Sequence, residues 1–316
     1  MRGPGTQPVP DDGIVAPDAP SALVLGAQTQ VSVRGLARWA AGVLAEREGL
    51  MDSPDLDAEV LLRHVLGLDR TAYFVAAQDA VALETALRYA DLLGRRLGGE
   101  PVAYLTGVRE FFGLPFLVTP DVLVPRPETE SLVQWALDRA RRHVPVTILD
   151  IGTGSGAIAL SVAARQPPDR TTRVIGSDLS GEALAVARRN QVALATNGAV
   201  SAVRFVRGDL AGWCRGPVDL LLANLPYLTT EQRMGNPELA AEPALALVSG
   251  PDGLVAIDRL VSDLPRALSP SGAAILELDP AQAEGVHYRI GLVMPSATVS
   301  ILEDLAGTAR FVTVER

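Results

Sequence analysis

The feature that most constrains the fold is an alternation of short apolar runs with helical segments through the second half of the chain. The apolar runs are too short for helices and read as buried strands, and three of the segments between them, 156–166, 181–195 and 254–268, are expected to be helices. Such alternation predicts an α/β, doubly wound, Rossmann-like fold with a seven-stranded sheet. The strands are expected at 146–151, 173–178, 203–207, 218–223, 273–278, 298–302 and 310–314.

A glycine-rich loop, Asp150-Ile-Gly-Thr-Gly-Ser-Gly156, follows the first expected strand and opens a helix. Glycines let the backbone approach a ligand closely, and a helix N-terminus offers free amide groups. The loop also satisfies the loose dinucleotide fingerprint, so NAD remains an alternative cofactor at this point. The candidate cofactor contacts are Gly152, Thr153, Gly154, Ser155 and Gly156.

Acidic residues end the next two expected strands. Asp178 has the spacing at which a carboxylate accepts both ribose hydroxyls, and a cap for the helix after Ser180 is the alternative. Asp209, followed by Leu210, could meet an adenine amino group, and a turn-forming aspartate is the alternative. Both positions suit a cofactor that carries adenosine.

The fourth expected strand ends abruptly in Asn224-Leu-Pro-Tyr227, at the edge of the sheet where ligands bind in open α/β folds. Pro226 restricts Leu225 to extended geometry, which fixes the direction of the Leu225 carbonyl. That carbonyl and Asn224 Oδ1 could accept both hydrogens of a planar NH2 group, with Tyr227 against its π-face. The pattern suits methylation of an amide or exocyclic amine nitrogen. A strand stopped by a proline turn is the alternative.

The rest of the chain divides by periodicity and composition. Residues 1–28 are rich in Pro, Gly and Asp and are expected to form a disordered tail. Residues 29–100 have helical spacing and predict a small bundle, either for partner recognition, as a lid, or only as support for the next domain. Residues 101–124 read as a linker and a β-hairpin. Residues 125–316 form the sheet domain.

Composition excludes several classes of protein. The single Cys214 rules out an intrachain disulfide, and three scattered histidines suggest no metal site. A net charge of −9 argues against binding nucleic acid mainly through its phosphates. No apolar run approaches the ~20 residues that a membrane span needs. We expect a cytoplasmic monomer with no metal, no membrane contact and no stable association with nucleic acid.

Together the motifs resemble those of class I S-adenosylmethionine-dependent methyltransferases, and more closely those of the HemK/PrmC family. The resemblance runs from about residue 31 to the end and implies a glutamine N5-methyltransferase of peptide chain release factors, acting on their Gly-Gly-Gln glutamine. It implies S-adenosylmethionine as the cofactor, with Asn224 near it. The motifs are Glu110-Phe-Phe-Gly113, Val124-Pro-Arg-Pro-Glu-Thr-Glu130, Asn224–Tyr227, Glu242-Pro243, Gly250-x-x-Gly253-Leu254 and Asp304-Leu-Ala-Gly307.

Within the second motif, Arg126, Pro127 and Glu128 are candidate substrate contacts, and a plain proline-entered helix start is the alternative. One residue departs from the family pattern, because Leu225 stands where Asn-Pro-Pro-Tyr has its first proline. Leucine keeps the backbone carbonyl, but Asn-Leu-Pro-Tyr is also typical of ribosomal RNA adenine N6-dimethyltransferases. Adenine methylation of RNA or DNA therefore stays open, as does a non-catalytic cofactor-binding homologue.

Overall fold

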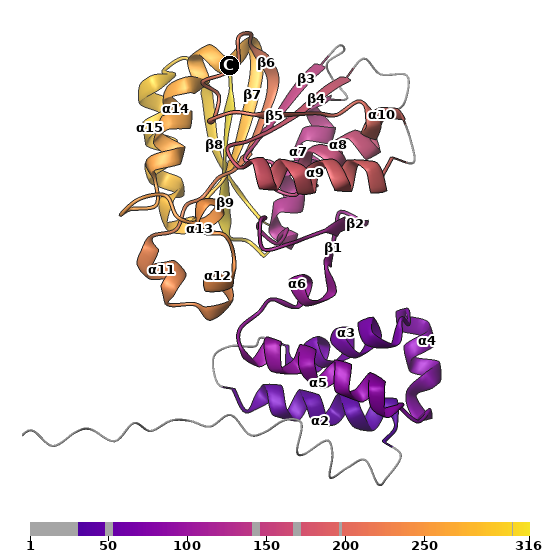
Figure 1. The fold of residues 1–316 in the computed structure, drawn as a ribbon. Coiled ribbons are helices and arrows are strands. Elements are labelled where there is room, and N and C mark those ends of the chain that lie inside the picture. Colours follow the sequence, from indigo (N-terminus) through magenta and orange to yellow (C-terminus); the bar gives the residue numbers. More distant parts are fainter. Residues whose placement is uncertain (1–30, 48–52, 141–145, 167–171, 196–197, 305) are drawn as a thin grey trace, which may run out of the picture. The chain divides into compact units, whose positions relative to one another are not determined.

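The computed structural model describes residues 31–47, 53–140, 146–166, 172–195, 198–304 and 306–316. The tail predicted at residues 1–28 lies outside the described residues. The chain divides after Gly98 into two units, which are drawn in Figure 1.

The N-terminal unit is a helical bundle, as predicted. Ser32 caps its first helix, because Ser32 Oγ accepts a hydrogen bond from Gly35 N at 3.2 Å. Tyr89 is fully buried between the helices, and its hydroxyl donates to the Ala58 carbonyl at 2.9 Å. The sequence did not predict the short α4. The helices are α2 (Val33–Ala45), α3 (Pro54–Leu66), α4 (Arg70–Val75), η1 (Ala76–Gln78) and α5 (Leu83–Leu97).

The second unit begins with a segment that was expected to be a linker. It contains the helix α6 (Val102–Thr106), which starts after Pro101 and is too short to show periodicity in the sequence. The hairpin that follows is present, with β1 (Val108–Phe111) antiparallel to β2 (Leu114–Leu117).

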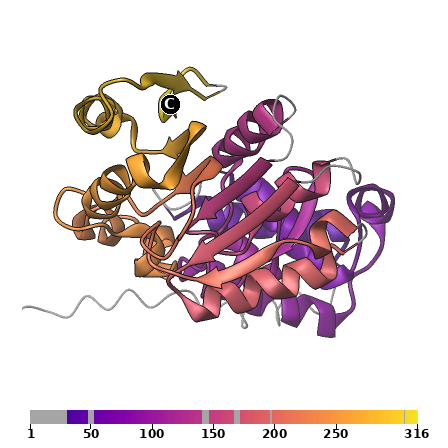
Figure 2. The same cartoon turned by 90° about the horizontal axis from the view of Figure 1, so that it is seen from above.

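The predicted seven-stranded sheet is confirmed. Its strand order is β5-β4-β3-β6-β7-β9-β8, and β9 runs antiparallel to both of its neighbours (Figure 2). The central strands are buried on both faces, which explains their continuous apolar sequence. The strands are β3 (Val146–Ile151), β4 (Thr172–Asp178), β5 (Arg204–Arg207), β6 (Val218–Asn224), β7 (Leu268–Glu277), β8 (Thr298–Glu303) and β9 (Ala309–Glu315).

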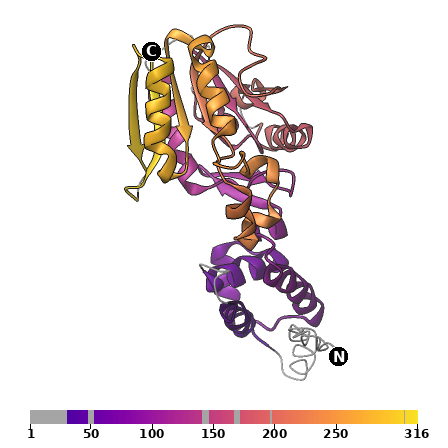
Figure 3. The same cartoon turned by 90° about the vertical axis from the view of Figure 1, so that its left-hand side faces the viewer.

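Helices cover both faces of the sheet. Alternate residues of β6 point to opposite sides: Leu220 and Leu222 pack with α7 and α8, whereas Leu221 and Ala223 pack with α14 and α15. Figure 3 shows α15 beside strands β8 and β9. Within the described ranges, no helix combines the length and apolarity needed to cross a membrane. The helices of these layers are α7 (Glu130–Ala140), α8 (Ala157–Arg165), α9 (Gly181–Ala193), α10 (Gly198–Ser201), α14 (Val255–Ala267) and α15 (Ala283–Val293).

Short helical segments lie at the ends of several strands. Three of them form an insertion between β6 and β7 that the sequence did not predict, and the first is closed by a capping box between Thr229 and Gln232. The insertion consists of α11 (Thr230–Met234), α12 (Pro237–Ala241) and α13 (Ala244–Leu247). Two 3-10 turns, η2 (Pro127–Thr129) and η3 (Pro280–Gln282), precede α7 and α15.

Candidate cofactor and substrate site

Two cavities open at the carboxyl end of β6, where that strand ends in Asn224. The first has a volume of about 320 Å³ and is bounded by the segments that follow β3, β4 and β5. The second has a volume of about 350 Å³ and is bounded by η2 and the α11–α13 insertion. The cavities share part of their walls and are therefore adjacent at the end of β6. The shared residues are Leu123, Asn224, Leu225, Pro226 and Ala246.

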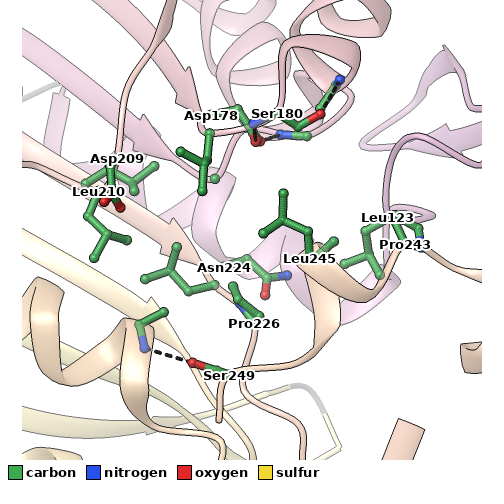
Figure 4. Close-up of a pocket in the computed structure, with 18 of the residues that line it drawn as sticks. Leu123, Asp178, Ser180, Asp209, Leu210, Asn224, Pro226, Pro243, Leu245 and Ser249 are labelled. Atoms are coloured by element: carbon green, nitrogen blue, oxygen red, sulfur yellow. Dashed lines mark hydrogen bonds between the residues drawn. The ribbon is translucent and has the colours of Figure 1, made fainter. Parts of the chain in front are cut away.

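The glycine-rich loop and Asp178 form one wall of the first cavity (Figure 4). Gly154 N donates to Asp178 Oδ2 at 2.8 Å, and Ser180 N donates to Asp178 Oδ1 at 2.9 Å. A carboxylate oxygen can accept two hydrogen bonds, so each still has capacity for a ligand hydroxyl. Burial raises the pKa of Asp178, and the backbone amides partly offset this effect. The predicted contacts Gly152 and Gly154 both line the cavity.

Three other predicted cofactor contacts shape the loop without lining the cavity. The Thr153 hydroxyl donates to Asp150 Oδ2 at 2.6 Å, and the Ser155 carbonyl accepts from Asn190 Nδ2 at 2.9 Å. Gly156 is the N-cap of α8. Burial raises the pKa of Asp150 to about 7, against the hydrogen bonds from Thr153 and Ala159. The polar groups of Thr153 and Ser155 therefore fix the conformation of the loop from inside the protein.

Asp209 and Leu210 line the first cavity, as the sequence suggested, but Asp209 has a partner that the sequence did not reveal. Its Oδ2 accepts a hydrogen bond from Arg259 Nη2 at 2.6 Å, and both side chains are about half exposed. Arg259 comes from α14 and lines the same cavity. One oxygen of Asp209 is therefore engaged by the protein.

The second cavity has a charged rim. Arg126 and Glu128 line it, whereas the third predicted substrate contact, Pro127, only begins η2. Arg126 forms an ion pair with Glu242, which is 2% exposed and also accepts from Val124 N at 2.9 Å. This pair ties the proline-rich loop to the turn between α12 and α13. Burial raises the pKa of Glu242, and Arg126 opposes that effect.

Asn224 lies between the cavities with one end of its amide already bound. Asn224 Nδ2 donates to the Thr129 hydroxyl at 3.0 Å, which leaves Oδ1 as the acceptor that can meet a ligand. Tyr227 lines the second cavity, and burial raises its pKa to about 12. Its backbone carbonyl is held by Gln282 Nε2 at 3.0 Å.

The sequence missed several residues of the site. Leu123, Pro243, Leu245 and Ser249 complete the first cavity, and they lie in or next to segments that carried the family resemblance. Thr129 was missed although it belongs to the proline-rich motif. Among the described residues, no group of three or more His, Cys, Asp or Glu side chains is placed to hold a metal ion.

Comparison with known proteins identifies two domains in this chain. Residues 36–107 match the PrmC N-terminal domain, and residues 148–236 match a methyltransferase domain. The catalytic domain of hMettl16 superposes with a TM-score of 0.51 at 15% identity, covering 73% of this chain and 80% of that one, which shows the fold alone.

Two curated relatives match over most of their length. The release factor glutamine methyltransferase of Deinococcus radiodurans is 39% identical over 265 residues, which are 84% of this chain and 92% of the relative. The enzyme of the same name from Moorella thermoacetica is 39% identical over 264 residues, which are 83% of this chain and 91% of the relative. The resemblance to the HemK/PrmC family is thus confirmed, and the chain belongs to the family of release factor glutamine methyltransferases.

Proposed function

We propose that this protein transfers a methyl group from S-adenosylmethionine to the side-chain amide nitrogen of the Gly-Gly-Gln glutamine in peptide chain release factors. The observation that carries the proposal is the meeting of two cavities at Asn224, whose free Oδ1 can accept from a planar NH2 group. The names of the relatives point to the same substrate.

The first cavity fits the cofactor in size and chemistry. Its volume of about 320 Å³ is in the range of small-molecule sites, and its lining is largely apolar with few polar groups. Asp178 offers acceptors for ribose hydroxyls, and Gly152 and Gly154 allow close backbone approach. S-adenosylmethionine, when bound, supplies an electrophilic methyl group on its sulfonium.

Positioning is the task left to the chain, because the lone pair of an amide nitrogen is delocalised and weakly nucleophilic. Asn224 Oδ1 and the Leu225 carbonyl hold the two N–H groups, which turns the nitrogen toward the first cavity. Tyr227 confines the amide plane from the second cavity. Holding two reactants in a reactive geometry can lower the barrier by roughly 7–11 kcal/mol.

Leu225 is compatible with an amide substrate. Its side chain is 5% exposed and packs in the core, where a Cβ at Gly152 would lie only 3.2 Å from Leu225 Cδ2. The residue that departs from the family motif thus directs its side chain under the cofactor loop and keeps its carbonyl for the substrate.

Methyl transfer from labelled cofactor tests the proposal, with purified release factors, a Gln→Ala release factor and total RNA as substrates. Mass spectrometry is expected to find methylglutamine in the Gly-Gly-Gln tripeptide and nothing in the Gln→Ala protein. Methylated adenine together with unmodified release factors would overturn the proposal in favour of the nucleic-acid alternative.

Leu225→Pro is expected to retain or improve methylation of release factors, because proline restores the family motif and keeps the carbonyl. The variant should melt at a lower temperature, since it loses part of a buried leucine side chain. Steady-state kinetics and thermal melting measure the two effects. Loss of release-factor methylation in a folded variant would show that Leu225 itself selects the substrate.

Asp178→Ala is expected to weaken S-adenosylmethionine binding by at least ~1.5 kcal/mol, or about tenfold, through lost charge-assisted hydrogen bonds. Part of the loss comes from the loop, because Gly154 N loses its acceptor. Calorimetry gives the affinity, and a thermal melt checks that the variant is folded. Unchanged affinity would remove Asp178 from the cofactor site, and preferential binding of NAD would revive the dinucleotide alternative.

A further inference from the structure

Two buried polar residues, Glu277 and Thr129, are neighbours of Asn224. Glu277 ends β7, pairs with Asn224 in the β6–β7 register and is 1% exposed. Thr129 is 4% exposed and accepts the hydrogen bond from Asn224 Nδ2. Neither carboxylate oxygen of Glu277 has a hydrogen-bond partner among the described residues. A buried carboxylate of this kind is costly and calls for a functional explanation.

The groups around Glu277 set its pKa. Burial raises its pKa to about 7, and Glu128 adds to this effect, while Arg310 and Arg126 oppose it. The Thr129 hydroxyl is near enough to lower the pKa of Glu277 as well. The negative charge of Glu277 also acts on Tyr227 and helps to raise the pKa of its phenol. A Thr129 hydroxyl that turned its proton toward Glu277 would link this carboxylate to Asn224.

A hydroxyl group has a single proton, so its hydrogen bonds have a direction. If Thr129 donates to Glu277, its oxygen can only accept from Asn224. The NH2 end of Asn224 must then face Thr129, and Oδ1 must face the cavities. The two ends of a carboxamide have nearly the same shape, so without this constraint Asn224 could turn its NH2 toward the substrate NH2, where two donors would meet.

We propose that Glu277 and Thr129 are positioning residues that fix the Asn224 amide with its oxygen toward the substrate nitrogen. The inference rests on the proposed function, and it applies to any substrate whose reactive group is a planar NH2. Neither residue touches the substrate or the cofactor. They act through the orientation of Asn224.

The first test compares three threonine variants with a release factor as substrate. Thr129→Val removes the hydroxyl at nearly constant shape and is expected to lower kcat about tenfold or more, with cofactor affinity within about twofold of wild type. Thr129→Ser keeps the hydroxyl and is expected to restore most of kcat. The matched control is Thr313→Val, because Thr313 is also buried but lies on β9 with its hydroxyl on the Ser300 carbonyl.

The second test uses pH. In this proposal the ionised carboxylate of Glu277 accepts from the Thr129 hydroxyl, and the protonated acid is a weaker acceptor. The value of kcat should therefore be full above the pKa of Glu277 and fall as the pH drops through about 7. Glu277→Gln is expected to have a lower kcat without this acid limb. The pKa of Asp150 in the cofactor loop is also raised to about 7. The assay therefore uses saturating S-adenosylmethionine, so that a change in cofactor affinity over this pH range does not lower the measured rate.

Three results would overturn the inference: wild-type kcat in Thr129→Val, equal loss in Thr129→Ser and Thr129→Val, or an unchanged acid limb in Glu277→Gln. Failure of the proposed function looks different, because the wild-type enzyme would leave release factors unmodified. If it then methylates adenine in RNA, the same variants are assayed on RNA with the same expectations. A wild type inactive on both substrates would overturn both ideas.

Discussion

Asn224→Ala is expected to lower kcat on release factors by about a hundredfold or more, while affinity for S-adenosylmethionine changes much less. The substitution removes the side-chain oxygen that holds the substrate NH2 in the reactive complex, a contact that matters most in the transition state. It leaves Gly152, Gly154 and Asp178 in place. Turnover and calorimetric affinity, measured on the same preparation, separate the two effects.

Asn224→Asp serves as the companion variant. It keeps the size and the acceptor oxygen of Asn224, but it adds a negative charge where the sulfonium would bind and loses the donor that bonds to Thr129. We expect it to be poor as well. Turnover near the wild-type rate in Asn224→Ala would mean that the amide is held by other groups and that the proposed mechanism is wrong.

Gly253→Ala is expected to destabilise the protein by about 2–4 kcal/mol and to abolish most methyl transfer. The backbone of Gly253 has a φ of 76°, and an added Cβ would lie 2.0 Å from the carbonyl oxygen of Tyr227. Backbone cannot yield as a flexible side chain can, so Tyr227 would have to move. Urea unfolding and steady-state kinetics measure the two losses.

Gly107→Ala is the matched control. Gly107 has nearly the same φ, 75°, but an added Cβ there has nothing within 4 Å. It carries the cost of the left-handed backbone, about 1–2 kcal/mol, without the clash. Equal losses of stability and activity in the two variants would show that strain alone, and not contact with Tyr227, explains the effect of Gly253→Ala.

The sheet and the cofactor loop could be predicted because their signals are local. Strand β3 was expected with the bounds that it has, and the glycine-rich loop follows it directly. The α11–α13 insertion gave no such signal. Neither α11 nor α12 buries a side chain, so no apolar face was present for periodicity to detect.

The missed parts of the site depend on residues that are distant in sequence. Asn224 and Thr129 are 95 residues apart, and Asp209 and Arg259 are 50 residues apart. Glu277 becomes a neighbour of Asn224 only through the register of two parallel strands. A charged residue at the end of an apolar strand was visible in the sequence, but its partner was not.

The wall shared by the two cavities has a thermodynamic consequence. If a bound cofactor shifts Asn224 or Ala246 and changes the affinity for the protein substrate by some factor, the protein substrate must change the affinity for the cofactor by the same factor. The reciprocity extends to the products, so the spent cofactor and the methylated protein alter each other's affinity equally. A substitution in the shared wall that changes this coupling should therefore change it by the same factor whichever of the two ligands is measured.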